Sequence, residues 1–255
     1  MERGVIHYHG LPITPQTASV EAIAGGHAFV SFRHADQLSG AIEFAQSFAV
    51  DNGAFSAWRA GEPITDWSPF YDWVAGLRNQ PCLDFAVIPD VIDGDEAAND
   101  ALVKAWPLGQ LGAPVWHLHE SIARLHRLCD EWPRVCLGSS GDFARVGSQA
   151  WWNRMAEAMD AVCDADGLPS ARLHGLRMLD PEIFSRFPFA SADSTNIGRN
   201  IGIDKAWGGP YPPPPTKEAR AAFMRRRIES TQAATRWTRR LYQVGDLFDL
   251  AVGVK

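Results

Sequence analysis

The chain has 255 residues, which suits one large domain or two small ones, and its 46% hydrophobic and 21% charged residues exclude disorder, collagen-like repeats and a coiled coil. The formal net charge of −6 argues against a surface that binds nucleic acid all over. The sequence has no apolar run long enough to span a bilayer and no signal-peptide core, so we expect a cytoplasmic protein without a membrane partner. The four cysteines form no Cys-x-x-Cys pair, which is typical of reduced thiols in the cytoplasm (Cys82, Cys129, Cys136 and Cys163).

Short apolar runs rich in β-formers recur eight times and predict strands at Val5–His9, Ala28–Phe32, Ser47–Asp51, Asp84–Pro89, Pro114–His119, Arg134–Gly138, Ala171–Gly175 and Phe189–Asp193. Segments of helical composition separate them, at Thr17–Ala24, Asp36–Ala45, Pro69–Leu77, Asp95–Trp106, Ser121–Glu131 and Ser148–Ala165. Strands that alternate with helices indicate a parallel α/β sheet, and eight such units in about 250 residues favour a TIM-like (β/α)8 barrel. A doubly wound open sheet is the alternative, but no Gly-x-Gly-x-x-Gly follows the first strand.

A compositional boundary divides the chain into a predicted barrel domain, residues 1–208, and a C-terminal part, residues 209–255. This second part opens with the proline run Pro212–Pro215, after which Thr216 is a plausible helix N-cap. The predicted helix over Thr216–Tyr242 carries a net charge of +6. It is either a solvated surface helix or a phosphate-binding face, for which Arg225, Arg236, Arg239 and Arg240 are the candidate contacts.

Polar residues follow the predicted strands at their C-terminal ends, which is where a (β/α)8 barrel places its active site. These residues are His7 and His9, Asp51-Asn52-Gly53, Asp90, His117, His119 and Glu120, Gly138-Ser139-Ser140-Gly141, His174, and Asp193-Ser194-Thr195-Asn196. Each one alone has an ordinary structural explanation, as a helix cap or a hydrogen-bonded histidine. Together they predict a site at this end of the barrel.

Two chemistries fit these residues. Metal-assisted hydrolysis, as in amidohydrolase-like barrels, would use His7, His9, His117, His119, His174 and Asp193 as ligands. Exchange of a base at a glycosidic carbon needs a carboxylate nucleophile, a second carboxylate as acid and base, and a stacking face. Asp51, Asp90 and Asp193 could supply the carboxylates, and Phe55 the stacking face.

The pentapeptide Asp51-Asn52-Gly53-Ala54-Phe55 resembles the Asp-Ser-Gly-Gly-Phe/Tyr signature of the tRNA-guanine transglycosylase superfamily. It is more similar still to the Asp-Ser-Gly-Ala-Phe of the DNA-modifying and phage-borne relatives in that superfamily. Further similar segments follow in the same order over about residues 45–202, namely Asp84–Val91, Val135–Gly141, Leu173–Leu176 with Asp180-Pro181-Glu182, and Asp193–Asn196 with Gly198-Arg199-Asn200.

This resemblance implies a base-exchanging pentosyltransferase with a (β/α)8 barrel and no cofactor. Asp193 would be the nucleophile, and Asp51 would protonate the departing guanine and deprotonate the incoming 7-deazaguanine-type base. The resemblance further implies base-binding roles for Asp90, Phe55, His119, Gly138, Ser139 and His174, and contacts from Arg199 and Asn200 to the polynucleotide. Phe55 and His174 would then lie against the two faces of the base.

The chain departs from the tRNA-acting members in three respects. Their Cys-x-Cys-x-x-Cys zinc motif is missing, so no metal is expected, and Asn52 and Ala54 replace the usual serine and second glycine. These departures favour DNA over tRNA as the partner. A non-catalytic nucleic-acid-binding barrel, acting through the predicted basic helix, is the third hypothesis.

Overall fold

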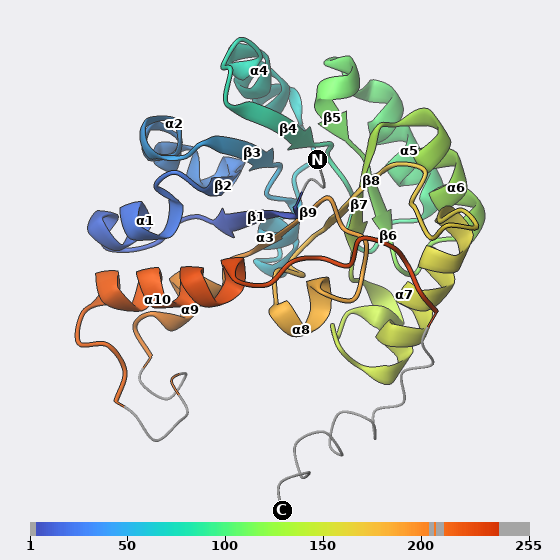
Figure 1. Cartoon of the computed structure of the whole chain (residues 1–255). Helices are drawn as coiled ribbons and strands as arrows, with labels where there is room; N and C mark the ends of the chain where they lie inside the picture. Colours follow the sequence, from blue (N-terminus) through green and yellow to red (C-terminus); the bar gives the residue numbers. More distant parts are fainter. Residues whose placement is uncertain (1–3, 204–206, 208–211, 240–255) are drawn as a thin grey trace, which may run out of the picture.

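Nine parallel β-strands form a nearly closed barrel at the centre of the part of the chain that the computed structural model describes, residues 4–203, 207 and 212–239 (Figure 1). Their order around the barrel is β5-β4-β3-β2-β1-β9-β8-β7-β6. The strands are β1 (Ile6–Gly10), β2 (His27–Ser31), β3 (Ser47–Asp51), β4 (Leu83–Val87), β5 (Gly112–Ala113), β6 (Val115–His117), β7 (Arg134–Gly138), β8 (Arg172–Gly175) and β9 (Ser191–Ser194). The mixed α/β class and the parallel barrel are thereby confirmed, and the architecture is consistent with a TIM-like barrel.

The two edge strands of this sheet, β5 and β6, are consecutive in the chain and are separated by Pro114 alone. β5 pairs with β4, and β6 pairs with β7. The carbonyl of Ala113 accepts the amide of Ile88 on one side, and the carbonyl of Pro114 accepts the amide of Cys136 on the other. Proline has no amide proton to give to a ladder, and Pro114 separates the two strands at the closure point. The predicted strand Pro114–His119 corresponds to β6 alone, and β5 lies before it.

Helices surround the barrel in Figure 1, and the six helices predicted between the strands are present with their ends shifted by a few residues. The helices are α1 (Gln16–Ile23), α2 (Leu38–Phe44), α3 (Ala54–Arg59), α4 (Ser68–Leu77), α5 (Glu96–Ala105), α6 (Ile122–Glu131), α7 (Gln149–Val162), α8 (Pro181–Phe184), α9 (Asn196–Asn200) and α10 (Lys217–Glu229), with short 3₁₀ turns at Phe32–Gln37, Gly109–Leu111 and Gly141–Phe143. Side-chain caps begin α5, α6, α7 and α10 at Asp95, Ser121, Ser148 and Thr216. In the described residues, no helix combines the length and apolar character that a bilayer span requires.

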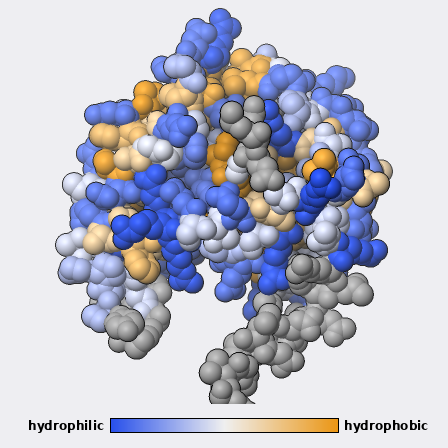
Figure 2. Space-filling model, in the orientation of Figure 1, coloured by the Kyte–Doolittle hydropathy of each residue, from blue (hydrophilic) through white to orange (hydrophobic). Residues whose placement is uncertain are grey.

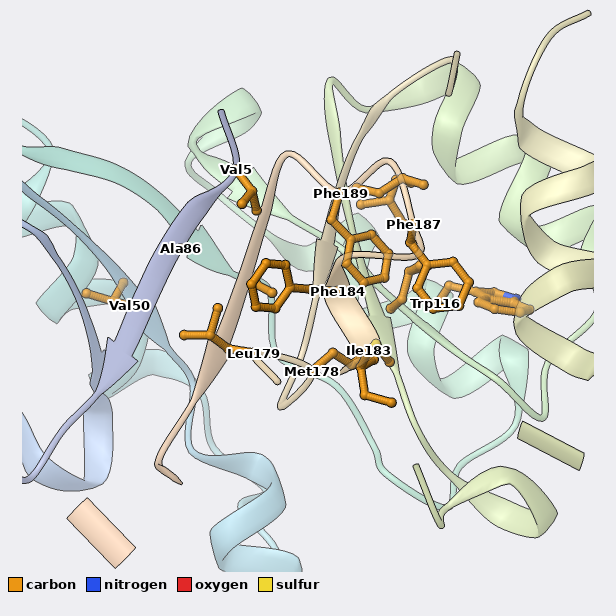
Figure 3. Packing of buried hydrophobic residues seen from close by; sticks show 14 of the residues in the cluster. Val5, Val50, Ala86, Trp116, Met178, Leu179, Ile183, Phe184, Phe187 and Phe189 are labelled. Atoms are coloured by element: carbon orange, nitrogen blue, oxygen red, sulfur yellow. The ribbon is translucent and has the colours of Figure 1, made fainter. Parts of the chain in front are cut away.

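Two apolar clusters sit on the two faces of the strands, because successive side chains of a strand point to opposite sides. The inner cluster fills the barrel and consists of Tyr8, Phe29, Ala49, Phe85, Val87, Ala113, Val115 and Cys136. The outer, larger cluster packs the strands against the helices. Figure 3 shows part of it, where Phe184, Phe187 and Phe189 come together; the rings of Phe187 and Phe189 stack with their centroids 5.2 Å apart.

An ionic network inside the barrel involves Arg134, at the start of β7. The Tyr8 hydroxyl donates to the Asp84 carboxylate at 2.6 Å, and Arg134 donates to both oxygens of the same carboxylate at 2.9 and 3.1 Å. The Arg134 guanidinium also lies 4.1 Å from the centroid of the Phe85 ring. Burial and the neighbouring Asp84 raise the pKa of Tyr8 well above its ordinary range. These groups lie toward the end of the barrel where the strands begin, and the cavity described below lies at the opposite end, where the strands finish.

The C-terminal segment ends its helix earlier than the sequence predicts. Helix α10 begins after the predicted Thr216 cap but stops at Glu229, and residues 230–239 continue without helix, held by non-local contacts. The amide of Val5 donates to the side chain of Gln232, and Trp237 donates to Gly167 through its backbone and to Asp160 through its indole. Figure 1 shows α10 alongside α1, against which it packs.

Candidate functional site

A cavity of about 350 Å³ opens at the C-terminal ends of the strands. Of the residues that the sequence predicted for the site, it brings together Asp51, Asn52, Phe55, Asp90, His117, Gly138, Ser139, Asp193, Thr195 and Arg199. Arg59, Arg177 and His34 also line it. Three carboxylates, from the ends of β3 and β9 and the turn after β4, therefore share one cavity.

Asp51 ends strand β3 and accepts a hydrogen bond from the amide of Gly53 at 3.1 Å. Gly53 has φ +82°, a left-handed conformation that glycine adopts without strain, and it lets the chain turn directly into α3. Burial, together with the nearby carboxylates of Asp193 and Asp90, raises the pKa of Asp51 to about 7. Asp51 can therefore hold a proton or release it close to neutral pH.

Asp90 is buried, and both of its carboxylate oxygens have neighbours. One oxygen accepts a hydrogen bond from the amide of Asn52 at 2.9 Å, and the other lies 2.9 Å from Nε2 of His117. Asn52 donates its second amide proton to the carbonyl of Ile88 and accepts the amide of Ala54. Asn52 therefore ties the end of β3 to the turn after β4 and fixes the orientation of Asp90.

His117 approaches β7 closely because position 138 is a glycine. A Cβ on Gly138 would lie 3.2 Å from Nδ1 of His117, a crowded distance. The backbone amide of His117 donates to Glu120, whose other oxygen accepts from Asn99. Since the side-chain oxygen of Asn99 also accepts the amide of Val91, one buried network holds the chain on both sides of the Asp90–His117 pair.

Asp193 lies in strand β9 and is buried. Its Oδ1 accepts the backbone amide of Arg177 at 2.8 Å and lies 3.4 Å from Nε2 of His174. The other ring nitrogen of His174 lies 2.8 Å from the hydroxyl of Ser191. Burial lowers the pKa of His174, so the ring is neutral at neutral pH and orients the carboxylate without adding a charge.

The side chain of Arg177 lies over the ring of Phe55, and both residues line the cavity. Its guanidinium carbon lies 3.8 Å from the centroid of the Phe55 ring, and the guanidinium donates to the carbonyl of Ser139 at 3.1 Å. Arg177 has φ +59° and, among the described residues, is the non-glycine residue with a positive φ. That conformation allows its backbone to reach Asp193 while its side chain covers Phe55.

Two residues expected at the base, His174 and His119, lie outside the cavity lining. His174 is fully buried, with its ring stacked on Phe29 at a centroid distance of 5.4 Å, so it cannot lie against a face of a bound base without a rearrangement. The ring nitrogens of His119 are engaged by the Ser140 hydroxyl and the Gly94 carbonyl, and it is His117 that lines the cavity instead.

Asn200, expected at the polynucleotide, bonds back to Asn196 within α9. Ser139 lines the cavity, but its hydroxyl accepts the indole of Trp151 on the helix side. Its backbone carbonyl accepts a hydrogen bond from the Arg177 guanidinium.

The structure separates the histidines that a metal-dependent hydrolase would need to bring together. The ring of His7 contacts the carbonyl of Thr231, and that of His9 contacts the carboxylate of Glu229, so both point outward to the C-terminal segment. Tyr8, between them, points into the barrel. Throughout the described ranges, no group of three or more His, Cys, Asp or Glu side chains is arranged to hold a metal ion.

The arginines predicted to share one helix face do not do so, because α10 ends before Arg236. Arg225 donates to Glu229 and to the carbonyl of Ala24, and Arg239 lies 3.1 Å from Asp160. Arg236 lies 3.9 Å from Asp166, and Arg240 lies outside the described residues. The three described arginines are thus directed to groups of the protein itself.

Sequence reasoning missed Arg177, the role of Asn52 in holding Asp90, and Arg59. Asn52 and Arg59 lie within or just after the pentapeptide that begins at Asp51, so their closeness to the site could have been inferred from position. Arg177 carried no such signal, because a left-handed arginine cannot be recognised in a single sequence.

No family model matches the chain, and no curated protein matches its sequence.

Proposed function

We propose that the protein is a transglycosylase-like enzyme of (β/α)8 topology that exchanges a guanine-type base, of the 7-deazaguanine class, in a polynucleotide, with DNA as the preferred substrate. The observation that carries the proposal is the meeting of Asp51, Asp90 and Asp193 in one cavity, with the pKa of Asp51 at about 7. Base exchange needs a nucleophile that stays ionised and a second carboxyl that gives and takes a proton. Asp193 accepts the backbone amide of Arg177, whereas the pKa of Asp51 is raised, and this difference supports Asp193 as the nucleophile and Asp51 as the acid and base.

In the proposed first step, a carboxylate oxygen of Asp193 forms a bond to C1′ of the sugar, and the glycosidic bond between C1′ and the base nitrogen breaks. Asp51 supplies the proton that the departing base takes up. The incoming base then loses a proton to Asp51, its nitrogen bonds to C1′, and Asp193 leaves as a carboxylate. Protons and electron pairs balance over the two steps, and no oxidant or reductant is needed.

The remaining lining residues fit a planar polar ligand. The cavity volume of about 350 Å³ falls at the lower end of the range typical of small-molecule sites. Asp90 is held in a fixed orientation by Asn52 and His117, which suits a carboxylate that accepts hydrogen bonds from the edge of a base. The choice of DNA over tRNA rests on the sequence, which lacks the Cys-x-Cys-x-x-Cys motif.

The test measures release of labelled guanine from DNA and from tRNA side by side, with wild type and Asp193→Asn. Because the amide keeps the shape of the side chain and removes the nucleophile, we expect exchange and the covalent protein–DNA adduct to be lost. Asp180→Asn is the matched control, since Asp180 caps α8 outside the cavity and asparagine is an equally good cap. Exchange by Asp193→Asn within about tenfold of wild type, a barrier change of about 1.4 kcal/mol, would refute the assignment.

A further inference from the structure

Helix α3 presents an aromatic and cationic surface beside the cavity. Phe55, Trp58 and Arg59 lie on one face of the helix, since residues three and four apart are neighbours. The rings of Phe55 and Trp58 have centroids 5.8 Å apart, and the Arg59 guanidinium carbon lies 5.9 Å from the Phe55 centroid. Trp58 is 42% exposed, while Phe55 and Arg59 line the cavity. The Trp58 side chain is therefore open to solvent and contacts Phe55 at the edge of the cavity.

Charge is distributed unevenly between the depth of this cavity and its mouth. The carboxylates of Asp51, Asp90 and Asp193 lie at the strand ends, and Asp90 and Asp193 are buried. The exposed arginines Arg59 and Arg199 line the same cavity from α3 and α9. A ligand with a neutral polar part inside and an anionic part at the mouth complements this arrangement. A nucleotide embedded in a strand has that shape, because its phosphates flank the base and sugar.

We propose that Trp58 and Arg59 form a subsite for the unpaired nucleotide next to the target nucleotide in a DNA strand. The neighbouring base stacks on Trp58, and the phosphate between the two nucleotides lies by Arg59. This inference rests on the proposed function and deepens it by assigning a single-stranded substrate. In duplex DNA both faces of the neighbouring base are covered by adjacent base pairs, so no face is free for Trp58.

Isolated exposed aromatic residues are common on protein surfaces and need no function. Phe223, on α10, is 45% exposed and does not line the cavity; its ring contacts that of Trp207 at a centroid distance of 5.5 Å. Trp58 differs because its ring contacts Phe55, which lines the cavity, and because the next residue, Arg59, is a cation that also lines the cavity. This difference provides a matched control for the experiment.

The experiment measures binding of three probes to the full chain: a single-stranded oligodeoxynucleotide with one guanine flanked by thymines, the same oligonucleotide annealed to its complement, and deoxyguanosine. Trp58→Ala is expected to weaken binding of the single strand about tenfold, as loss of one base–aromatic stack would. Binding of deoxyguanosine should be unchanged, because it has no neighbouring base. Trp58→Phe should restore most of the affinity, and Phe223→Ala should have no effect.

Arg59→Gln should reduce the salt dependence of single-strand binding by about 0.7 in log K against log salt, the contribution of one phosphate. Arg78→Gln is its control, since Arg78 is exposed at the end of α4, at the opposite end of the barrel from the cavity. Unchanged single-strand binding by Trp58→Ala would overturn the subsite, and so would an equal loss for deoxyguanosine or for the duplex.

Different results would refute the proposed base exchange and the proposed Trp58 subsite. If wild type shows no exchange but binds single strands in a manner that depends on Trp58, the subsite is supported and the enzymatic proposal is refuted. If exchange occurs and Trp58→Ala binds the single strand normally, the subsite alone is refuted.

Discussion

Replacing Asp51 with asparagine should stabilise the protein, and the gain should depend on pH. In the folded chain the pKa of Asp51 is about 7, against 3.8 for an unperturbed aspartate. Between these values the unfolded chain has released the proton and the folded chain has kept it. The folded state therefore binds more protons, and the free energy of unfolding falls as pH rises through this window.

The size of the effect follows from the pKa difference of about three pH units. At about 1.4 kcal/mol per unit, ionising Asp51 at pH 8 costs the fold up to about 4 kcal/mol. Below pH 4 the cost vanishes, because the carboxyl is protonated in both states. Asparagine never ionises and can still accept the amide of Gly53, so Asp51→Asn should be more stable than wild type by about 2 to 4 kcal/mol at pH 8 and about equal to it near pH 4.

Urea denaturation of both proteins at several pH values measures this difference directly. Asp72→Asn, at an exposed position on α4, controls for the general effect of removing one negative charge. A stability gain that is independent of pH, or a loss at pH 8, would show that Asp51 is not a carboxyl kept protonated by burial. In the same variant exchange should be lost, since the amide cannot carry the proton between the two bases.

Two other substitutions test the geometry around the cavity. In Asn52→Ser the shorter side chain cannot span both Ile88 and Asp90; we expect a loss of about 2 to 3 kcal/mol in urea denaturation, together with weaker base binding. Arg177→Gly should cost little stability, because relief of the left-handed strain, about 1 kcal/mol, offsets the lost side-chain contacts, whereas Arg177→Ala keeps the strain and should be about 1 kcal/mol less stable than the glycine variant. Equal stability of the two Arg177 variants would mean that position 177 does not adopt a left-handed conformation in solution.

Much of the barrel could be predicted from the sequence, because its strands are buried on both faces and so form short continuous apolar runs bounded by glycine and proline. Ser47–Asp51 and Arg134–Gly138 coincide with β3 and β7. Helices α3, α8 and α9 were not predicted, since at four to six residues they are too short to show a helical period.

The end of α10 was predicted wrongly for a different reason. Residues 230–239 hold no glycine or proline, so no local signal stops the helix at Glu229. What shapes this segment is its docking on the barrel, through Gln232 to Val5 and through Trp237 to Gly167. Contacts between residues so far apart in the chain do not affect the local composition, so the end of α10 could not be predicted from it.

The candidate site, too, could be predicted only in part. The rule that parallel barrels collect polar residues at their strand ends predicted that Asp51, Asp90 and Asp193 would meet, and the structure brings them together. The partners of each carboxylate could not be predicted, since they depend on the exact course of the loops. His117 and His119 illustrate this: they are two positions apart in the chain, yet His117, at the end of β6, lines the cavity, whereas His119 contacts Ser140.

Three carboxylates in one enclosed space cannot all be ionised at low cost, so the surrounding donors decide which of them holds the proton. Asp90 is compensated by the amide of Asn52 and the imidazole of His117, and Asp193 by the backbone amide of Arg177. Asp51 is the carboxyl whose pKa rises to about 7, and the charges of the other two contribute to that rise. The proton is therefore expected on Asp51, the carboxyl whose pKa is raised by burial and by the two neighbouring carboxylates. In this arrangement, a substitution at Asn52 or His117 would change the acid–base behaviour of Asp51 through the Asp90 carboxylate that both residues contact.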